Sequence, residues 1–280
     1  MSTLTLKLWG VRGSTPSPGP TTVRHGGNTP CISIEMGEKC LVIDAGTGIR
    51  GLGKYLVPSR YEIFVLLTHE HWDHIQGFPF FLPIYQKDRI MTMFPVERGM
   101  DFLCSLIDQM DGAHFPVTYK ELPSHQECYL GDPMEFLNRS GFKIRRQRTN
   151  HPGKCFGYRI DHGKHSIVFM PDNELHPPGK QWTHIDELAK FCHGADILMH
   201  DGQFMPSDMP MKRGWGHSLA SEACELAARA GVGHLLLFHH DPDRTDDELD
   251  VIETDCRAWM AKHSPKTKVS AAAEGMTFTF

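Results

Sequence analysis

Residues 68–74 read T-H-E-H-W-D-H and follow directly on the run Y-E-I-F-V-L-L of residues 61–67. The β-branched and aromatic content of residues 61–67 predicts a buried strand. Polar residues after a strand are usual in a solvated loop. Three histidines and an aspartate within six positions are hard to explain that way, and imidazole together with carboxylate suits zinc and similar ions. We therefore interpret residues 68–74 as part of a metal site at the end of a buried strand.

The spacing inside this stretch indicates which side chains act together. His69 and His71 are two positions apart, so in extended chain they point to the same side and can share one metal. Asp73 and His74 follow where the chain turns, and they can face a second metal beside the first. The stretch is therefore compatible with two neighbouring metal ions.

Length and composition are those of an ordinary globular protein. The chain has 280 residues, of which 40% are hydrophobic and 22% are charged. This length suits one large domain or two small ones, and we expect a single α/β domain over residues 1–280. The formal net charge of −5 gives no general basic bias towards nucleic acid. Histidine is abundant, with 18 copies, which fits metal binding.

Cysteine usage and hydropathy bear on location. The eight cysteines contain no C-x-x-C pair, and their spacing suggests no disulfide framework. The first residues lack the basic start and the long apolar core of a signal peptide, and no stretch is long and apolar enough to span a membrane. We therefore expect a cytoplasmic protein without a membrane partner.

Apolar and alternating runs between turn residues predict further strands. They lie at residues 4–9, 31–35, 39–44, 89–94, 117–122, 142–149, 155–160, 165–170, 195–199 and 234–238, with closing strands at Val269 and 278–280. Helical spacing predicts helices at residues 49–56, 99–110, 185–192, 218–230 and 246–261, the fourth with Ser218 as its N-cap. Residues 10–28 are rich in glycine and proline and predict a long loop, which is either functional or a mobile surface loop.

Other predicted strands also end in residues with metal chemistry, namely Asp44, His151, Asp172 and His239. Asp44 is either a helix cap or a carboxylate that orients a ligand histidine. Asp172 is either a ligand or a turn-capping residue. His200 and His240 compete with His239, and we prefer His239 over His240 because it comes directly after an apolar strand.

Two further segments suit an anion. The strand before His151 carries basic residues at Lys143, Arg145, Arg146 and Arg148. They could attract a phosphate, or they could belong to a solvated strand face. His217 stands just before a predicted helix, where unpaired N–H groups favour an anion.

The order H-x-H-x-D-H, then histidine, aspartate and histidine at later strand ends, resembles the metallo-β-lactamase superfamily over roughly residues 4–280. The resemblance implies an α/β fold of the αββα sandwich type with a dinuclear site at one edge of the two sheets. It implies two Zn²⁺ ions, with Mn²⁺ or another divalent metal as alternatives, which together lower the pKa of a trapped water. Carried over by motif, the ligands are His69, His71 and His151 for the first zinc, Asp73, His74 and His239 for the second, and Asp172 as the bridge.

Within the superfamily, the chain is most similar to the phosphodiesterase branch that includes RNase Z and the cyclic-phosphate phosphodiesterases. Asp172 stands where the antibiotic-hydrolysing β-lactamases have a cysteine. Residues 216–218 resemble the general-acid histidine motif of that branch, and residues 235–240 resemble its final motif. The resemblance implies that metal-bound hydroxide attacks phosphorus, that Asp73 helps to orient it, and that His217 binds the phosphate and protonates the leaving oxygen.

The resemblance also bears on the substrate. Many RNase Z enzymes clamp tRNA with a long inserted arm, whereas only a predicted hairpin separates His151 from Asp172 here. With the acidic net charge, this favours a small phosphodiester, for which a cyclic nucleotide is a candidate, and argues against a stable nucleic-acid partner. A hydrolase of another ester class (thioester or lactone), RNase Z-like RNA processing and a non-catalytic sensor are the alternatives. Relatives are often dimers, so a homodimer is a further expectation.

Overall fold

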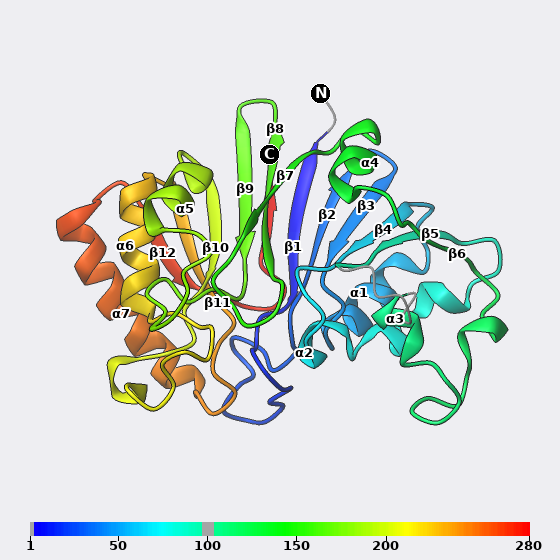
Figure 1. The fold of residues 1–280 in the computed structure, drawn as a ribbon, viewed down its shortest axis with the longest axis horizontal. Coiled ribbons are helices and arrows are strands. Elements are labelled where there is room, and N and C mark those ends of the chain that lie inside the picture. Colours follow the sequence, from blue (N-terminus) through cyan, green and yellow to red (C-terminus); the bar gives the residue numbers. More distant parts are fainter. Residues whose placement is uncertain (1–2, 97–103) are drawn as a thin grey trace.

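Two β-sheets face each other at the centre of the molecule (Figure 1). The computed structural model describes residues 3–96 and 104–280. The first sheet has seven strands, in the order β13 (Thr277–Thr279), β1 (Leu4–Gly10), β2 (Cys31–Met36), β3 (Lys39–Ile43), β4 (Glu62–Leu66), β5 (Ile90–Phe94) and β6 (His125–Cys128). The second has six, in the order β12 (Lys268–Ala271), β11 (His234–Phe238), β10 (Ile197–Asp201), β9 (His165–Met170), β8 (Phe156–His162) and β7 (Lys143–Arg148).

Helices cover the outer faces of both sheets. On the first sheet lie α1 (Ile49–Leu56), α2 (Trp72–Ile75) and α3 (Ser105–Asp108), with the 3₁₀ turns η1 (Phe78–Phe80), η2 (Leu82–Tyr85) and η3 (Tyr119–Glu121). On the second lie α5 (Ile185–Cys192), α6 (Ala220–Ala230) and α7 (Asp246–His263), with the 3₁₀ turn η4 (Pro206–Asp208) nearby. The remaining helix, α4 (Pro133–Arg139), packs on β7.

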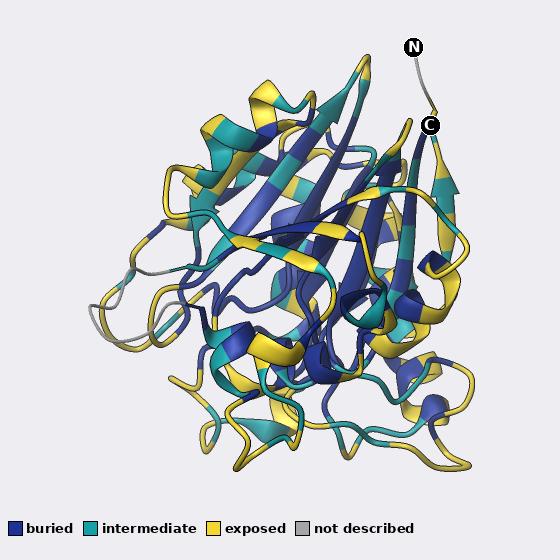
Figure 2. Cartoon of the chain, turned by 90° about the vertical axis from the view of Figure 1, so that its right-hand side faces the viewer, coloured by how far each residue is buried: buried dark blue, intermediate teal, exposed yellow. Residues whose placement is uncertain are grey.

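Three apolar layers hold this arrangement together, and the central strands of the sheets are mostly buried, whereas the edge strands β6, β7 and β13 are partly exposed (Figure 2). The central layer joins the two sheets and includes Ile34 and Phe64 from the first with Phe169 and Phe238 from the second. The outer layers lie between each sheet and its helices. Burying one such side chain contributes roughly 1.5–3 kcal/mol, so the layers supply the main stabilising term. The predicted αββα sandwich is confirmed.

The carboxyl ends of several strands meet at one edge of the sandwich. In the first sheet β3 and β4 are parallel, and in the second β9, β10 and β11 are parallel. β7 runs in the same direction as β9, because both are antiparallel to β8. Ligand sites in α/β sheets form beyond the carboxyl ends of the strands. The residues at or just past these ends are Asp44, residues 68–74, His151, Asp172, Asp201 and His239.

Most predicted elements are present with bounds shifted by a few residues, and α1, α5, β9 and β11 have the predicted bounds. The strand predicted at residues 117–122 is wrong. There the backbone N–H and hydroxyl of Thr118 donate to Glu121 at 2.8 and 2.7 Å, and this pairing closes the 3₁₀ turn η3. Part of the helix predicted at residues 99–110 lies outside the described residues, and its described part is α3.

The predicted N-cap of the fourth helix is also wrong. α6 begins at Ala220, and the Glu222 carboxylate accepts the Leu219 N–H at 3.0 Å. The Ser218 hydroxyl is used elsewhere, since it donates to the Asn173 carbonyl at 2.6 Å. Among the described helices, none has both the length and the apolar character needed to cross a membrane.

Candidate metal centre

Three histidines form the first group of candidate ligands. His69 and His71 follow β4, and His151 follows β7. His71 Nδ1 lies 3.0 Å from His151 Nε2, and one ligand atom from each of the three rings lies within 4.8 Å of the other two. His69 and His151 are buried, whereas His71 is exposed. The group is therefore open to solvent on its His71 side.

Asp73, His74 and His239 form the second group. Asp73 and His74 lie on the short helix α2, and His239 follows β11. Asp73 Oδ2 lies 3.3 Å from His74 Nε2 and 3.2 Å from His239 Nε2. His239 has a φ of 58°, in the left-handed region that non-glycine residues rarely adopt. Backbone strain of this kind costs about 1–3 kcal/mol and is concentrated at functional sites.

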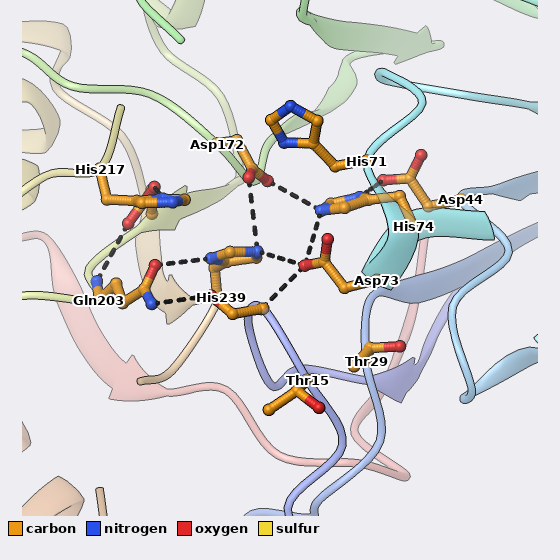
Figure 3. A network of polar contacts seen from close by, with 12 residues as sticks. Thr15, Thr29, Asp44, His71, Asp73, His74, Asp172, Gln203, His217 and His239 are labelled. Atoms are coloured by element: carbon orange, nitrogen blue, oxygen red, sulfur yellow. Dashed lines mark hydrogen bonds and ion pairs between the residues drawn. The ribbon is translucent and has the colours of Figure 1, made fainter. Parts of the chain in front are cut away.

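Asp172 lies between the two groups, with its carboxylate directed at their rings (Figure 3). One oxygen, Oδ1, is 3.2 Å from His74 Nε2. The other, Oδ2, is 3.4 Å from His239 Nε2 and 3.7 Å from His69 Nε2. The carboxylate therefore points at the histidines rather than capping a turn. A carboxylate in this position can bind one metal ion with each oxygen.

The donor atoms fit a pair of divalent metal ions. Within this cluster, three buried atoms make no hydrogen bond: His69 Nε2, His74 Nε2 and Asp172 Oδ1. A buried polar atom without a partner costs roughly 1–3 kcal/mol, so a cluster of three indicates an ion between them. Imidazole nitrogens and carboxylate oxygens without a thiolate suit Zn²⁺ and related divalent ions.

Asp44 holds the rings of His74 and His69 in place. Its Oδ2 accepts a hydrogen bond from His74 Nδ1 at 2.8 Å. The carboxylate also accepts the backbone N–H and the hydroxyl of Thr68, both at 2.8 Å, and Thr68 Oγ1 lies 3.1 Å from His69 Nδ1. α1 has Gly48, not Asp44, at its N-cap. These are the contacts of a carboxylate that orients ligands, not of a helix cap.

The rings of His151 and His239 are held from a loop of the second sheet. His151 Nδ1 donates to the Gly216 carbonyl at 2.9 Å, and His239 Nδ1 lies 3.1 Å from Gln203 Oε1. Gly216 has a φ of 93°, and a Cβ there would lie 2.4 Å from His151 Nδ1. Only glycine allows this approach. Both contacts leave Nε2 of each ring facing the cluster.

Burial and the neighbouring carboxylates shift the pKa values of the clustered histidines in opposite directions. Burial lowers the pKa of His69 well below its ordinary value and that of His151 to about 4, so both are neutral donors near neutral pH. Burial also lowers the pKa of His74, but the surrounding carboxylates, led by Asp73 and Asp172, outweigh it and raise that pKa. A bound cation would neutralise the same excess of carboxylate charge.

The loop between β1 and β2 is part of this site. The Ser14 N–H donates to Asp73 Oδ2 at 2.8 Å, and Gln203 Nε2 donates to the Ser14 hydroxyl at 3.2 Å. A Cβ on Gly13 would lie 2.4 Å from His239 Nδ1, so the backbone of the loop packs directly on that ring. These contacts support the functional interpretation of the loop.

His217 lies beside the second group and pairs with Asp201. Its ring stacks on His239, with centroids 4.9 Å apart and planes 16° apart (Figure 3). Its Nδ1 lies 2.7 Å from Asp201 Oδ2, within a buried environment. Burial lowers the pKa of His217, but the Asp201 carboxylate outweighs it and raises that pKa above the ordinary value. The imidazole can therefore hold a proton at the edge of the two ligand groups.

The seven residues predicted as ligands come together in one cluster, and their roles as ligands stay predictions. The competing histidines point elsewhere. His240 Nε2 lies 2.9 Å from the Ala272 carbonyl, and His200 Nε2 lies 3.0 Å from Asn173 Nδ2.

Sequence reasoning missed four participants: Ser14, Asp201, Gln203 and the Gly216 carbonyl. A usable signal for two of them was the polar pair His200-Asp201, which directly follows the strand predicted at residues 195–199 and is followed in turn by Gln203. It resembles the other ligand-bearing strand ends, but the sequence does not say which neighbour each side chain meets.

A family model described as a β-lactamase superfamily domain matches residues 40–240 of this chain. That range contains all seven clustered residues and His217. The chain belongs to the metallo-β-lactamase superfamily.

Two curated relatives indicate which branch of the superfamily the chain resembles. With a probable metallo-hydrolase of Bacillus subtilis, YhfI, the chain is 27% identical over 207 residues, covering 74% of this chain and 77% of YhfI. With a ribonuclease Z of Bradyrhizobium diazoefficiens it is 25% identical over 261 residues, covering 79% and 87%. These relatives place the chain among the metallo-hydrolases of the phosphodiesterase and RNase Z branch of this superfamily.

Solved structures share the fold over nearly the whole chain. The crystal structure of YhfI from Bacillus subtilis has a TM-score of 0.69 at 20% identity, covering 99% of this chain and 100% of that one. A diphosphatase from the PhnP family has a TM-score of 0.67 at 16% identity, covering 99% and 97%.

Proposed function

We propose that this metallo-hydrolase cleaves a small phosphodiester, with a cyclic nucleotide as a candidate, and that it uses two divalent metal ions, Zn²⁺ in the first place. The observation that carries the proposal is the buried pair of His217 and Asp201 beside the ligand cluster. An alkyl phosphodiester releases an alkoxide, which needs a proton, whereas a thioester releases a thiolate, which does not. An imidazole whose pKa is raised by a carboxylate is suited to supply that proton.

The ligand cluster divides between two metal positions. His69, His71 and His151 would hold one ion, and the second group would hold the other, with Asp172 facing both. When bound, such ions neutralise charge on the phosphate and lower the pKa of water.

Asp73 is placed to orient the attacking water. Burial would raise the pKa of this carboxyl, but His74 and His239 outweigh it and keep the pKa below the usual range, so Asp73 stays an acceptor. The Ser14 N–H fixes its Oδ2. His217 then donates its proton to the leaving oxygen, and Asp201 stabilises the imidazolium before the transfer.

The surroundings of the site favour a small substrate. A cavity of 190 Å³ opens beside His69 and His71 and extends to Lys154. Between β7 and β9 the chain forms only β8 and a short turn, so no arm is inserted between His151 and Asp172 where many RNase Z enzymes carry one. RNase Z-like processing is the second candidate, because curated relatives carry that name.

Turnover of a substrate panel tests the proposal. The panel contains 2′,3′-cyclic and 3′,5′-cyclic nucleotides, bis(4-nitrophenyl) phosphate, a lactone, a thioester and a precursor tRNA. We expect kcat/KM for the best small phosphodiester to exceed that for the thioester by about 100-fold or more, in line with the contribution of a general acid, and to exceed those for the lactone and the tRNA as well. Efficient 3′ processing of the tRNA, or a preference for the lactone or thioester, would overturn the proposal. No turnover of any substrate by metal-loaded protein would instead favour a non-catalytic sensor.

We further propose a homodimer, a cytoplasmic location and no stable nucleic-acid partner, and we retain the single domain over residues 1–280 as a prediction. Light scattering on the purified chain, with and without added RNA, should give twice the mass of 31.7 kDa in both cases. A monomer would contradict the proposed dimer, and a mass that rises with RNA would contradict the absence of a stable nucleic-acid partner.

A further inference from the structure

Asn173 directly follows the proposed bridging ligand Asp172 and is fully buried. Its amide oxygen, its amide nitrogen, its backbone N–H and its carbonyl each have a hydrogen-bond partner. A buried polar residue is expected to satisfy its groups. What is specific to Asn173 is the set of partners, because each is either Asp201 or a chain neighbour of His151, Asp201 or His217.

The side chain of Asn173 belongs to a row of hydrogen bonds that all run in one direction. Asn150, the residue before His151, donates its backbone N–H to Asn173 Oδ1 at 2.8 Å. Asn173 Nδ2 lies 3.0 Å from His200 Nε2, and His200 Nδ1 lies 2.7 Å from the Asp201 carbonyl. A carbonyl only accepts, so His200 Nδ1 carries the proton and His200 Nε2 accepts from Asn173. The same assignment leaves Asn173 Oδ1 as the acceptor for Asn150, so the contacts agree with one another.

The backbone of Asn173 holds the acid pair directly. Its N–H donates to Asp201 Oδ2 at 3.2 Å, and the same oxygen lies 2.7 Å from His217 Nδ1. Its carbonyl accepts the Ser218 hydroxyl at 2.6 Å, and Ser218 follows His217 in the chain. The segment that carries Asp172 is therefore bonded both to Asp201 and to the turn that carries His217.

His200 is a buried histidine that the proposed mechanism leaves without a role. Burial lowers its pKa despite the nearby Asp201 carboxylate, so the ring is neutral near neutral pH. A neutral imidazole has one donor and one acceptor nitrogen, and His200 uses both, one towards Asp201 and one towards Asn173. These two bonds fix the end of β10, which carries Asp201, to the segment after β9.

We propose that Asn173 is a positioning residue, which together with His200 fixes the Asp201–His217 pair relative to the Asp172 carboxylate. This inference rests on the proposed phosphodiester hydrolysis, because the placement of a proton donor matters only where the leaving group needs a proton. Asn173 acts through the acid pair and not on the substrate. Its contribution is geometric, since a misplacement of about 1 Å at a catalytic group can slow a reaction about 100-fold.

Asn173→Ala tests the inference through the leaving group. The variant loses both side-chain bonds, so kcat of zinc-saturated protein for a cyclic nucleotide, which releases an alkoxide, should fall about ten- to 100-fold. For bis(4-nitrophenyl) phosphate kcat should change by less than about threefold, since a nitrophenolate hardly needs a proton. KM should stay the same for both esters. Losses of similar size for the two esters would show a merely structural role and overturn the inference.

Asn138→Ala is the matched control. Asn138 lies on α4, at the opposite end of the sandwich from α2 (Figure 1). Its amide also joins separate segments, because it donates to the Met134 and Ile144 carbonyls at 2.6 and 2.9 Å and accepts the Ile144 N–H at 3.1 Å. Its loss should lower the melting temperature and leave kcat for both esters unchanged. A selective loss for the cyclic nucleotide in this control as well would contradict a special role of Asn173.

The inference stays testable if Asn173→Ala does not fold. Asn173→Ser is the second variant, because its hydroxyl suits polar surroundings but is too short to join both partners, and it should show the same selective loss. If neither variant folds, ¹⁵N NMR of the wild-type protein decides. The spectra should show the His200 proton on Nδ1, and a proton on Nε2 would overturn the row of bonds.

A failure of the proposed function is recognised separately. If the wild-type protein hydrolyses neither ester, the proposed function fails, and exchange of the His217 Nδ1–H with solvent tests the inference without turnover. In zinc-saturated samples this proton should exchange about tenfold faster in Asn173→Ala than in the wild-type protein, and at the wild-type rate in Asn138→Ala. Equal exchange rates in Asn173→Ala and the wild-type protein would contradict the positioning of the acid pair by Asn173.

Discussion

Replacing Asp201 with asparagine should weaken the proposed acid role of His217 while the seven candidate ligands stay in place. Asp201 is buried, and its Oδ2 accepts a hydrogen bond from His217 Nδ1 at 2.7 Å. Asparagine can still accept that bond through its amide oxygen, but it lacks the charge that raises the pKa of His217. Bound divalent cations nearby would lower the same pKa, so the carboxylate is needed to keep a proton on the ring.

The size of the effect follows from this contact. A hydrogen bond between charged groups contributes about 1.5–3 kcal/mol, and each 1.36 kcal/mol is a factor of ten, so the variant should hold the proton about ten- to hundredfold less well. His217 must be protonated to act, so activity falls as pH rises through its pKa. Lowering that pKa should move this fall to lower pH. At pH values above the pKa of His217, kcat for a substrate with an alkoxide leaving group should drop by the same ten- to hundredfold.

The assay compares kcat against pH for two substrates, with metal content measured on the same samples. An alkyl phosphodiester has a poor leaving group, whereas bis(4-nitrophenyl) phosphate releases a nitrophenolate that hardly needs a proton. Asp201→Asn should slow only the first, and His217→Ala should slow it by about 10²–10⁴-fold. The second Asp201 oxygen accepts the Gln203 N–H at 3.0 Å, so some loss of stability is expected and thermal unfolding is recorded separately. Equal losses for both substrates, or an unmoved pH profile, would refute the reasoning.

Three further predictions concern the ligand cluster. Gly216→Ala should lower both the metal content and the melting temperature, since the added Cβ would lie 2.4 Å from His151 Nδ1. Gly214→Ala is the control. Gly214 has a similar φ of 87°, but a Cβ there would meet only Pro178, at 3.3 Å. Asp44→Asn should weaken metal binding about 10–100-fold in a competition titration against a chelator, as for other partners that orient metal ligands; unchanged affinity would contradict its role. Chelation should abolish turnover and lower the melting temperature, and added Zn²⁺ should restore both. The melting temperature responds because an ion that binds only the folded state stabilises it. Full activity after chelation would contradict metal dependence.

The local part of the site could be predicted from the sequence because its information is local. A buried strand followed at once by H-x-H-x-D-H brings candidate ligands and their geometry together in one segment. The pairing of Asp201 with His217 could not be predicted in the same way. It depends on β10 lying between β9 and β11, and strand order in a sheet is set by long-range packing.

The two errors of secondary structure have a similar origin. Thr118 and Glu121 form a local capping pair that outweighs the strand preference of the apolar residues around them. Ser218 has the side chain of a good N-cap, but the turn after β9 offers its hydroxyl the Asn173 carbonyl and the Leu175 N–H, at 2.6 and 3.1 Å. Tertiary contacts therefore decide where α6 begins.

Anomalous diffraction at the zinc edge from crystals of the metal-loaded protein tests the two-metal centre directly. We expect two peaks, one on each side of the Asp172 carboxylate. One should lie among His69, His71 and His151, and the other should be bounded by the second ligand group. A spacing of about 3.5–4 Å is expected for ions that act as a pair. A single peak, or two peaks without Asp172 between them, would contradict a two-metal centre in this protein.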